Sequence, residues 1–258
     1  MGAAVHLDPL ALDFLWEALD AGDLPYPLWV RSHGATMDER AALRQGTLER
    51  LRAAGLLDAA GRIADSVDRM LGVLASHRTS VDAAFLPERG AVPVCAMAAA
   101  DHDQAVLAVQ GGDGDAGVWL SEIAPDGLVS AVVELLPAQP RGVVASVSLP
   151  TSAMAGVAAG ADPGGRSGGR TEVRDEQQVL AELTSMPRLR GGQIAANSRD
   201  DLGGRRRSPV LAWFDNETGR YTSSVRPGGD GHQWITVAPA DVAALRQRVG
   251  ELLAEVTG

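Results

Sequence analysis

Two segments of this 258-residue chain carry the same pattern, and this repeat limits the possible folds more than any other feature of the sequence. The first is "VWLSEIAPDGLVSAVVELL", residues 118–136, and the second is "QWITVAPADVAALRQRVGELL", residues 233–253. Each contains a Trp-bearing extended run, an Ala-Pro helix start with an Asp in the first turn, and an amphipathic helix that ends in Glu-Leu-Leu. Such a recurrence predicts two copies of one structural unit.

The segments that precede the repeated pattern also occur in the same order twice. In each part of the chain a helical pattern is followed by short extended runs, which fill residues 79–123 and residues 191–237. We therefore predict an α/β fold of the α+β type, in which a pseudo-two-fold central antiparallel β-sheet is flanked by two helical bundles. The chain then forms one domain, residues 1–258, of two related halves at about residues 26–137 and 142–258.

Several short signals place individual elements in the N-terminal region. Asp8 is a suitable N-cap for a helix with Pro9 at its first position, and Thr36 and Glu39 have the spacing of a capping box at a second helix start. The run "YPLWVRS", residues 26–32, alternates in the manner of a β-strand and predicts one there.

A Gly-rich break, "AGADPGGRSGGR" at residues 159–170, interrupts the second half only. It does not closely follow a strand and does not match the Walker or dinucleotide-binding patterns, so it is not expected to hold a phosphate. Its composition offers little apolar surface to offset the entropy cost of ordering. We expect a mobile surface loop.

The run "WFDNETGRY", residues 213–221, raises the question of a binding site because it gathers acidic, basic and aromatic side chains. It lies between two extended runs, where a hairpin must reverse. Asp215, Asn216 and Gly219 are residue types that tolerate such a reversal. The motif therefore predicts a turn, with Trp213 and Tyr221 packing against the faces of the sheet.

The triplet Arg205–Arg207 has two interpretations. It is either a solvated hairpin loop whose charge is balanced by Asp200 and Asp201, or a rim of guanidinium groups that binds carboxylates of a partner. Nucleic acid is a third hypothesis that only this patch supports. The net charge of -10 argues against general affinity for nucleic acid or anionic lipid, because polyanions are repelled at long range.

Motifs for catalysis are missing from the sequence. The histidines stand singly, without metal-ligand spacing, and no nucleophile motif is present. We expect no catalytic residue, no metal and no cofactor, although an enzyme whose site assembles in space stays an alternative. No run approaches the roughly 18 apolar residues of a membrane span, and the acidic N-terminus does not resemble a signal peptide. We expect a cytoplasmic protein without membrane insertion.

Several stretches of the chain resemble one known family. The C-terminal "GGQIAANSRDDLGGRRRSPVLAWFDNETGRYTSSV", followed by "WITVAPAD" and an amphipathic helix, is similar to the C-terminal region of EspG proteins of type VII (ESX) secretion. The N-terminal "LDFLWEAL", "LPYPLWVRSHGATMDER" and "AAGLLD" also resemble that family. The resemblance covers nearly the whole chain, except that the Gly-rich break is a departure or a variable insertion.

This resemblance implies a cytoplasmic, non-enzymatic chaperone. Proteins of this kind bind PE–PPE heterodimers at the helical tip of the PPE protein, keep them soluble and deliver them to the secretion machine. The family places client contact around the sheet and the C-terminal helices. The candidate partner-binding residues, with Leu202 as an apolar contact and Arg206 as a rim donor, are Arg199, Asp201, Leu202, Arg205, Arg206, Arg207, Trp213, Tyr221 and Ser223. The identity of the client and a weak homodimer are left open.

Overall fold

A single antiparallel sheet runs through the molecule. The structure, a computed structural model, describes residues 4–112, 116–153 and 170–258. In these residues the sheet has 11 strands, and every pair of neighbours is antiparallel, as predicted. The strand order is β1 (Val5–Leu7), β5 (Val118–Ile123), β4 (Gln104–Gly111), β3 (Val94–Asp101), β2 (Thr79–Leu86), β7 (Arg190–Arg199), β9 (Leu211–Asn216), β10 (Gly219–Pro227), β11 (Gln233–Pro239) and β6 (Val147–Pro150), with β8 (Arg205–Arg207) paired to β7.

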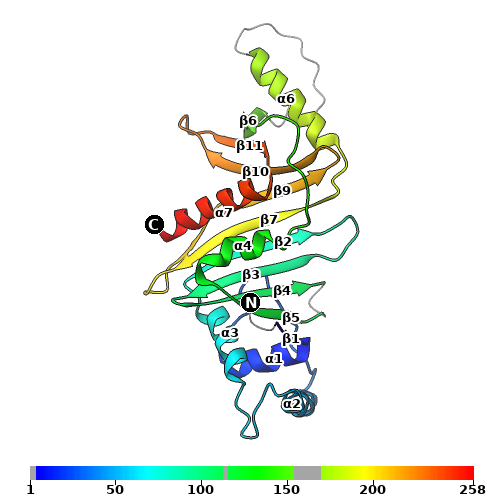
Figure 1. The fold of residues 1–258 in the computed structure, drawn as a ribbon, viewed down its shortest axis with the longest axis vertical. Coiled ribbons are helices and arrows are strands. Elements are labelled where there is room, and N and C mark those ends of the chain that lie inside the picture. Colours follow the sequence, from blue (N-terminus) through cyan, green and yellow to red (C-terminus); the bar gives the residue numbers. More distant parts are fainter. Residues whose placement is uncertain (1–3, 113–115, 154–169) are drawn as a thin grey trace.

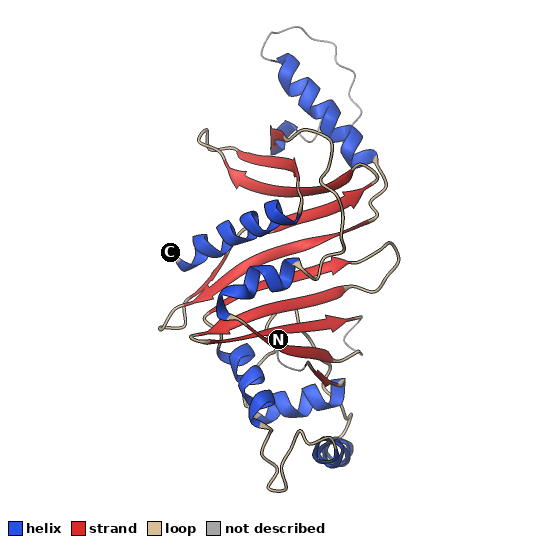
Figure 2. Cartoon of the chain, viewed as in Figure 1, coloured by secondary structure: helices blue, strands red, loops and turns tan. Residues whose placement is uncertain are grey.

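Helices cover the two faces of the sheet differently. Figure 1 shows α4 and α7 lying side by side across the middle of one face. The other helices lie at the two ends of the long axis, with α1, α2 and α3 at one end and α6 at the other (Figure 2). The bounds are α1 (Pro9–Ala18), α2 (Met37–Ala53), α3 (Asp65–Ser76), α4 (Leu128–Val133), α6 (Arg170–Ser185) and α7 (Val242–Thr257).

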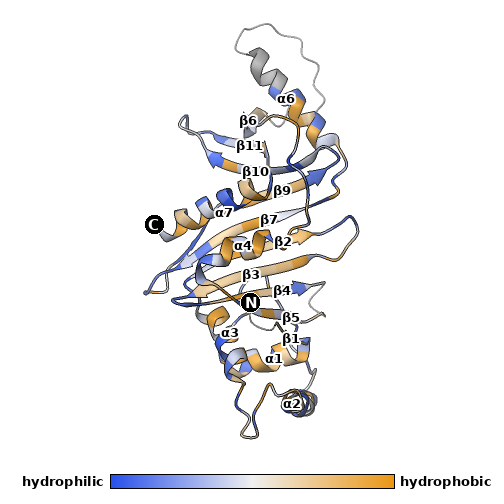
Figure 3. Cartoon of the chain, in the orientation of Figure 1, coloured by the Kyte–Doolittle hydropathy of each residue, from blue (hydrophilic) through white to orange (hydrophobic). Residues whose placement is uncertain are grey.

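The alternation of side chains along each strand divides the core between the two faces. In β2, Val81, Ala83 and Phe85 are buried against α4 and α7. On the opposite face, Met97 of β3 belongs to a core with α1 and α3, and Phe214 of β9 belongs to a core with α6. Figure 3 shows α4 and β3 as largely apolar elements, in line with their burial.

The predicted helix starts are confirmed. The side chain of Asp8 accepts a hydrogen bond from the backbone N–H of Ala11 at 2.7 Å, and Pro9 opens α1. Thr36 accepts from the backbone N–H of Glu39 at 3.2 Å, at the start of α2. Both caps satisfy donors that have no partner within the helix.

The strand predicted at residues 26–32 is wrong, because this segment forms a loop. The side chain of Gln110 takes the place of a neighbouring strand. Its amide oxygen accepts from the N–H of Trp29 at 3.0 Å, and its amide nitrogen donates to the carbonyl oxygen of Trp29 at 2.7 Å. The alternation of apolar residues follows burial of Leu28 against the α1 core rather than a sheet ladder.

The two Trp-bearing segments of the sequence repeat occupy corresponding positions in the strand order. β5 carries Trp119 and lies three strands from β2, while β11 carries Trp234 and lies three strands from β7. β2 and β7 pair at the centre, and β1 and β6 lie beyond β5 and β11. We propose two related halves on this basis, with the first starting at β1 rather than at residue 26. The Gly-rich loop predicted at residues 159–170 lies outside the described residues, apart from Arg170 at the start of α6.

Candidate partner-binding face

The middle of the face opposite α4 and α7 lies between the helices at its two ends. A row of directly opposed residues crosses this face, and we call it the central row. Its members in β2, β7, β9 and β10 leave their side chains at least partly accessible, and Gln193 is exposed. From the first half to the second, the central row consists of Gln110, Cys95, Ala84, Gln193, Ala212, Ser223 and Val237. Because most of these side chains are small, the surface of the sheet is recessed between the flanking helices.

One end of the central row opens into a groove beside α6, which we call the apolar groove. It has a volume of about 470 Å³, and Leu180 and Thr184 of α6 form one wall. Leu86 and Leu189 also line the groove and are 43% and 41% exposed. Exposed leucines in a concave surface are typical of contact with another macromolecule. Ser223, a predicted partner-binding residue, lies in this groove.

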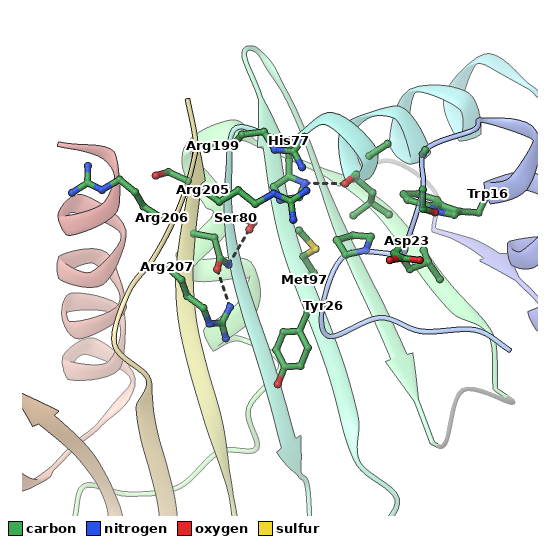
Figure 4. Close-up of a pocket in the computed structure, with 18 residues that line it drawn as sticks. Trp16, Asp23, Tyr26, His77, Ser80, Met97, Arg199, Arg205, Arg206 and Arg207 are labelled. Carbon is green, nitrogen blue, oxygen red and sulfur yellow. Dashed lines mark hydrogen bonds between the residues drawn. The ribbon is translucent and has the colours of Figure 1, made fainter. Parts of the chain in front are cut away.

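A second hollow, of about 510 Å³, lies next to α1 and α3, and we call it the basic pocket. Its strand residues include Ser80 and Asn197, which face the same side as the central row. Figure 4 shows Arg199, Arg205 and Arg207 around it and Tyr26 at its lower side. The apolar part of the wall is formed by Trp16, Ala21, Leu24, Pro25, Leu74, Ala75 and Met97.

The interpretation of Arg205–Arg207 as a solvated hairpin loop needs correction, because these residues form strand β8. Arg207 donates to the buried carboxylate of Asp82 at 2.6 and 3.0 Å, and this hydrogen bonding raises the pKa of Arg207. Arg206 points away from the basic pocket and donates to the carbonyl oxygen of Glu255 in the last turn of α7 (Figure 4). A cation there suits the negative end of the helix dipole. Arg205 has no side-chain partner among the described residues.

The loop between β7 and β8 presents Leu202 to solvent, with 97% of the residue exposed. Asp200 holds the loop by accepting hydrogen bonds from the N–H groups of Leu202, at 3.0 Å, and Gly204, at 2.7 Å. The next residue, Asp201, forms an ion pair with Arg78. An exposed leucine on a loop held by these bonds can contact a partner at a small cost in conformational entropy, because the loop has little freedom left to lose.

The expectation that Trp213 and Tyr221 contact a partner needs correction. Trp213 is 2% exposed and Tyr221 is fully buried. Trp213 packs against Phe85 beneath α4 and α7, and the Tyr221 hydroxyl is hydrogen-bonded to Thr218 at 2.7 Å. Both side chains are buried against a face of the sheet, which is the packing role that the hairpin interpretation predicts.

The hairpin itself is confirmed, with Asn216 opposite Gly219. Asn216 accepts a hydrogen bond from the N–H of Thr218 at 2.9 Å, and Gly219 has a φ of +119°. Sequence reasoning missed the buried pair beside this turn. Arg220 donates to both oxygens of Asp215 at 2.7 and 2.8 Å, with both residues at most 1% exposed. The turn register could have revealed the pairing, because it places these two residues opposite each other.

His77 lies in the basic pocket, where burial, followed by the charges of Arg199 and Arg205, lowers its pKa. No three His, Cys, Asp or Glu side chains in the described ranges gather in a way that could hold a metal ion. In the same part of the chain, every helix is too short or too polar to cross a membrane.

Comparison with known proteins identifies the family. A family model described as the EspG family matches residues 8–251. The chain belongs to the EspG family. Among solved structures, the chain is similar to the Mycobacterium tuberculosis type VII secretion system chaperone EspG5, determined in complex with a PE25–PPE41 dimer. The two chains share 16% identity with a TM-score of 0.67, over 98% of this chain and 96% of that one. This likeness shows a shared fold. A search of curated proteins gave no match.

Proposed function

We propose that this EspG protein is a cytoplasmic chaperone without catalytic activity. It binds a PE–PPE heterodimer at the helical tip of the PPE protein, keeps it soluble and delivers it to a type VII secretion system. The observation that carries this proposal is family membership over residues 8–251, together with a fold shared over 98% of the chain with a chaperone whose structure contains a PE–PPE dimer.

The central row and the apolar groove are the surface that we propose for the client. An α-helix with its side chains is about 10–12 Å across. Small residues such as Ala84 and Ala212 let such a helix lie close to the strands, while Leu86 and Leu189 supply apolar contacts. Docking of an amphipathic helix into a groove is a common mode of peptide recognition. The exposed Leu202 is a second apolar contact on the β7–β8 loop.

Co-expression with a PE–PPE pair, followed by size-exclusion chromatography, tests the chaperone function. Gln193→Trp places a bulky ring in the middle of the central row, and we expect at least a tenfold loss of affinity, or about 1.4 kcal/mol. Gln104→Trp is the matched control, because Gln104 is also an exposed Gln on a strand, β4, and lies away from the row. Wild-type affinity in a folded Gln193→Trp variant would rule out the central row.

The loop contact has its own matched pair of variants. Leu202→Asp should weaken the client complex, because it puts a charge on an apolar contact. Val143→Asp makes a similar change at an exposed apolar residue outside the proposed surface, where 81% of the residue is accessible, and should leave binding unchanged. Equal behaviour of the two variants would remove Leu202 from the site. A wild-type protein that captures no PE–PPE client would contradict the proposed function itself.

A further inference from the structure

The basic pocket contains two arginines whose charge the protein itself does not neutralise. The guanidinium groups of Arg199 and Arg205 form no hydrogen bond and no ion pair with any described residue. Arg207, by contrast, is neutralised by Asp82. The chain as a whole has a net charge of -10, whereas the two unpaired arginines make this pocket locally positive.

These two groups come together over a histidine. Figure 4 shows Arg199 and Arg205 beside His77, and all three residues line the basic pocket. The Nδ1 atom of His77 lies 2.8 Å from the carbonyl oxygen of Leu74, and its Nε2 atom has no partner among the described residues. The pocket thus presents two guanidinium groups and the Nε2 atom of an imidazole. Binding of an anion between these groups is electrostatically favourable.

The nearby carboxylates already have partners. Asp82 binds Arg207 at 2.6 Å, and Asp201 pairs with Arg78. Asp101 lies 3.8 Å from Arg78 and accepts a hydrogen bond from Ser76 at 3.3 Å. Asp23 lies on the far side of the pocket from the two arginines (Figure 4). An anion at Arg199 and Arg205 therefore has to come from outside the described residues.

The rest of the lining favours a polypeptide over a small inorganic anion. Leu24, Pro25 and Ala75 are partly accessible and give the pocket an apolar wall, which can take an apolar side chain but offers nothing to phosphate. The pocket also opens on the same face as the central row, and Arg199 and Arg205 flank the loop that carries Leu202. A protein bound along this face can thus place one of its segments in the pocket.

We propose that the basic pocket binds an acidic segment of the client, with a carboxylate held between Arg199 and Arg205 and a neighbouring apolar side chain against Leu24 and Pro25. This inference rests on the proposed chaperone function for its client. The planar guanidinium fork suits a carboxylate, and the pair sets the register of the client on the sheet face.

A peptide probe tests the pocket without any client. A fluorescein-labelled peptide of alternating Glu and Leu, and the same peptide with Gln for Glu, are titrated into the full-length protein by fluorescence anisotropy. We expect the Glu peptide to bind at least tenfold more tightly than the Gln peptide, and the double variant Arg199→Gln/Arg205→Gln to abolish this preference. The matched control is Arg52→Gln/Arg62→Gln, which makes the same change of charge on α2 and in the α2–α3 loop and should preserve the preference.

Inorganic phosphate provides the competing outcome. If phosphate binds at Arg199 and Arg205 and the Glu peptide does not, the pocket is a small-anion site and the inference is overturned. Equal affinity of the Glu and Gln peptides for the folded wild-type protein overturns it as well.

The client complex gives a second, independent readout. The Arg199→Gln/Arg205→Gln variant should bind a PE–PPE client at least tenfold more weakly and with a flatter dependence on salt than the wild type. An unchanged affinity and salt dependence would overturn the inference and leave the chaperone function intact. Failure of the wild-type protein to bind a client would instead contradict the function, while the peptide titration would still decide the chemistry of the pocket.

Discussion

At the scale of single residues, the pair Asp215–Arg220 shows how a side chain that looks like part of a surface turn can stabilise the interior. Arg220 lies 4.7 Å over the ring of Trp213 and donates to the carbonyl oxygen of Pro137 at 2.6 Å. Asp215 also pairs with Arg190 at 3.0 Å. This network ties the hairpin to the segment that links the two halves, and Asp215 and Arg220 at its centre are buried.

Removal of one member should therefore be costly. We expect Arg220→Met to lower the free energy of unfolding by about 3–5 kcal/mol, because it leaves the carboxylate of Asp215 buried with one partner fewer. Urea unfolding followed by circular dichroism measures the change. Arg62→Met, at an exposed ion pair with Asp58, should have little effect. If Arg220→Met is as mild as Arg62→Met, the buried network contributes nothing to stability.

At the scale of secondary-structure elements, a cluster of charges joins α1 to α2. Arg40 of α2 donates to both carboxylate oxygens of Asp13 in α1, at 3.0 and 3.1 Å, and it also pairs with Glu17. Burial raises the pKa of Asp13, but hydrogen bonds from Arg40 and His33 outweigh burial and leave it below the ordinary value of 3.8. Asp13 therefore binds its proton more weakly in the folded state than in the unfolded state.

This difference predicts how stability depends on pH. A carboxyl whose folded pKa is lowered stabilises the fold above its unfolded pKa, and the stabilisation is lost as the pH falls through the folded value. We expect the wild type to lose this contribution below about pH 4, and Asp13→Asn to be less stable at pH 7 and to lose less on acidification. Urea unfolding between pH 2.5 and 7 measures both. Asp103→Asn, at an exposed carboxyl in the turn between β3 and β4, is the control. Parallel curves for wild type and Asp13→Asn would contradict the prediction.

The elements also show where sequence reasoning succeeds. The extended run at residues 79–86 could be predicted to the residue because Pro87 and Gly90 mark the turn that follows it, although its burial does not alternate. β1 and β8 have three residues each, which is too short for a period to be visible. Residues 26–32 alternate like a strand but form a loop. The side chain of Gln110, 81 residues from Trp29 in the sequence, bonds to the Trp29 backbone in place of a neighbouring strand. For the same reason the basic pocket could not be predicted, since its residues come from distant segments.

At the scale of the whole molecule, the two proposed halves share one core. β2 and β7 pair over eight residues from Thr79 to Leu86, and the core beneath α4 and α7 contains residues of both halves. Leu245 of α7 is fully buried in it, as are Ala98 of β3 and Val132 of α4. A cavity at Leu245 thus removes contacts on both sides of the β2–β7 boundary, so neither half can keep its full stability alone.

The halves should consequently unfold together. We expect Leu245→Ala to lower the free energy of unfolding by about 2–5 kcal/mol, the usual cost of such a truncation in a buried core. Native-state hydrogen exchange followed by mass spectrometry should show the slowest amides of β3 and those of β10 losing the same protection, because both exchange through global unfolding. Val225→Ala, at an exposed position in β10, should change neither. Loss of protection in β10 alone would mean that the second half unfolds by itself, and that the shared core does not make the sheet cooperative.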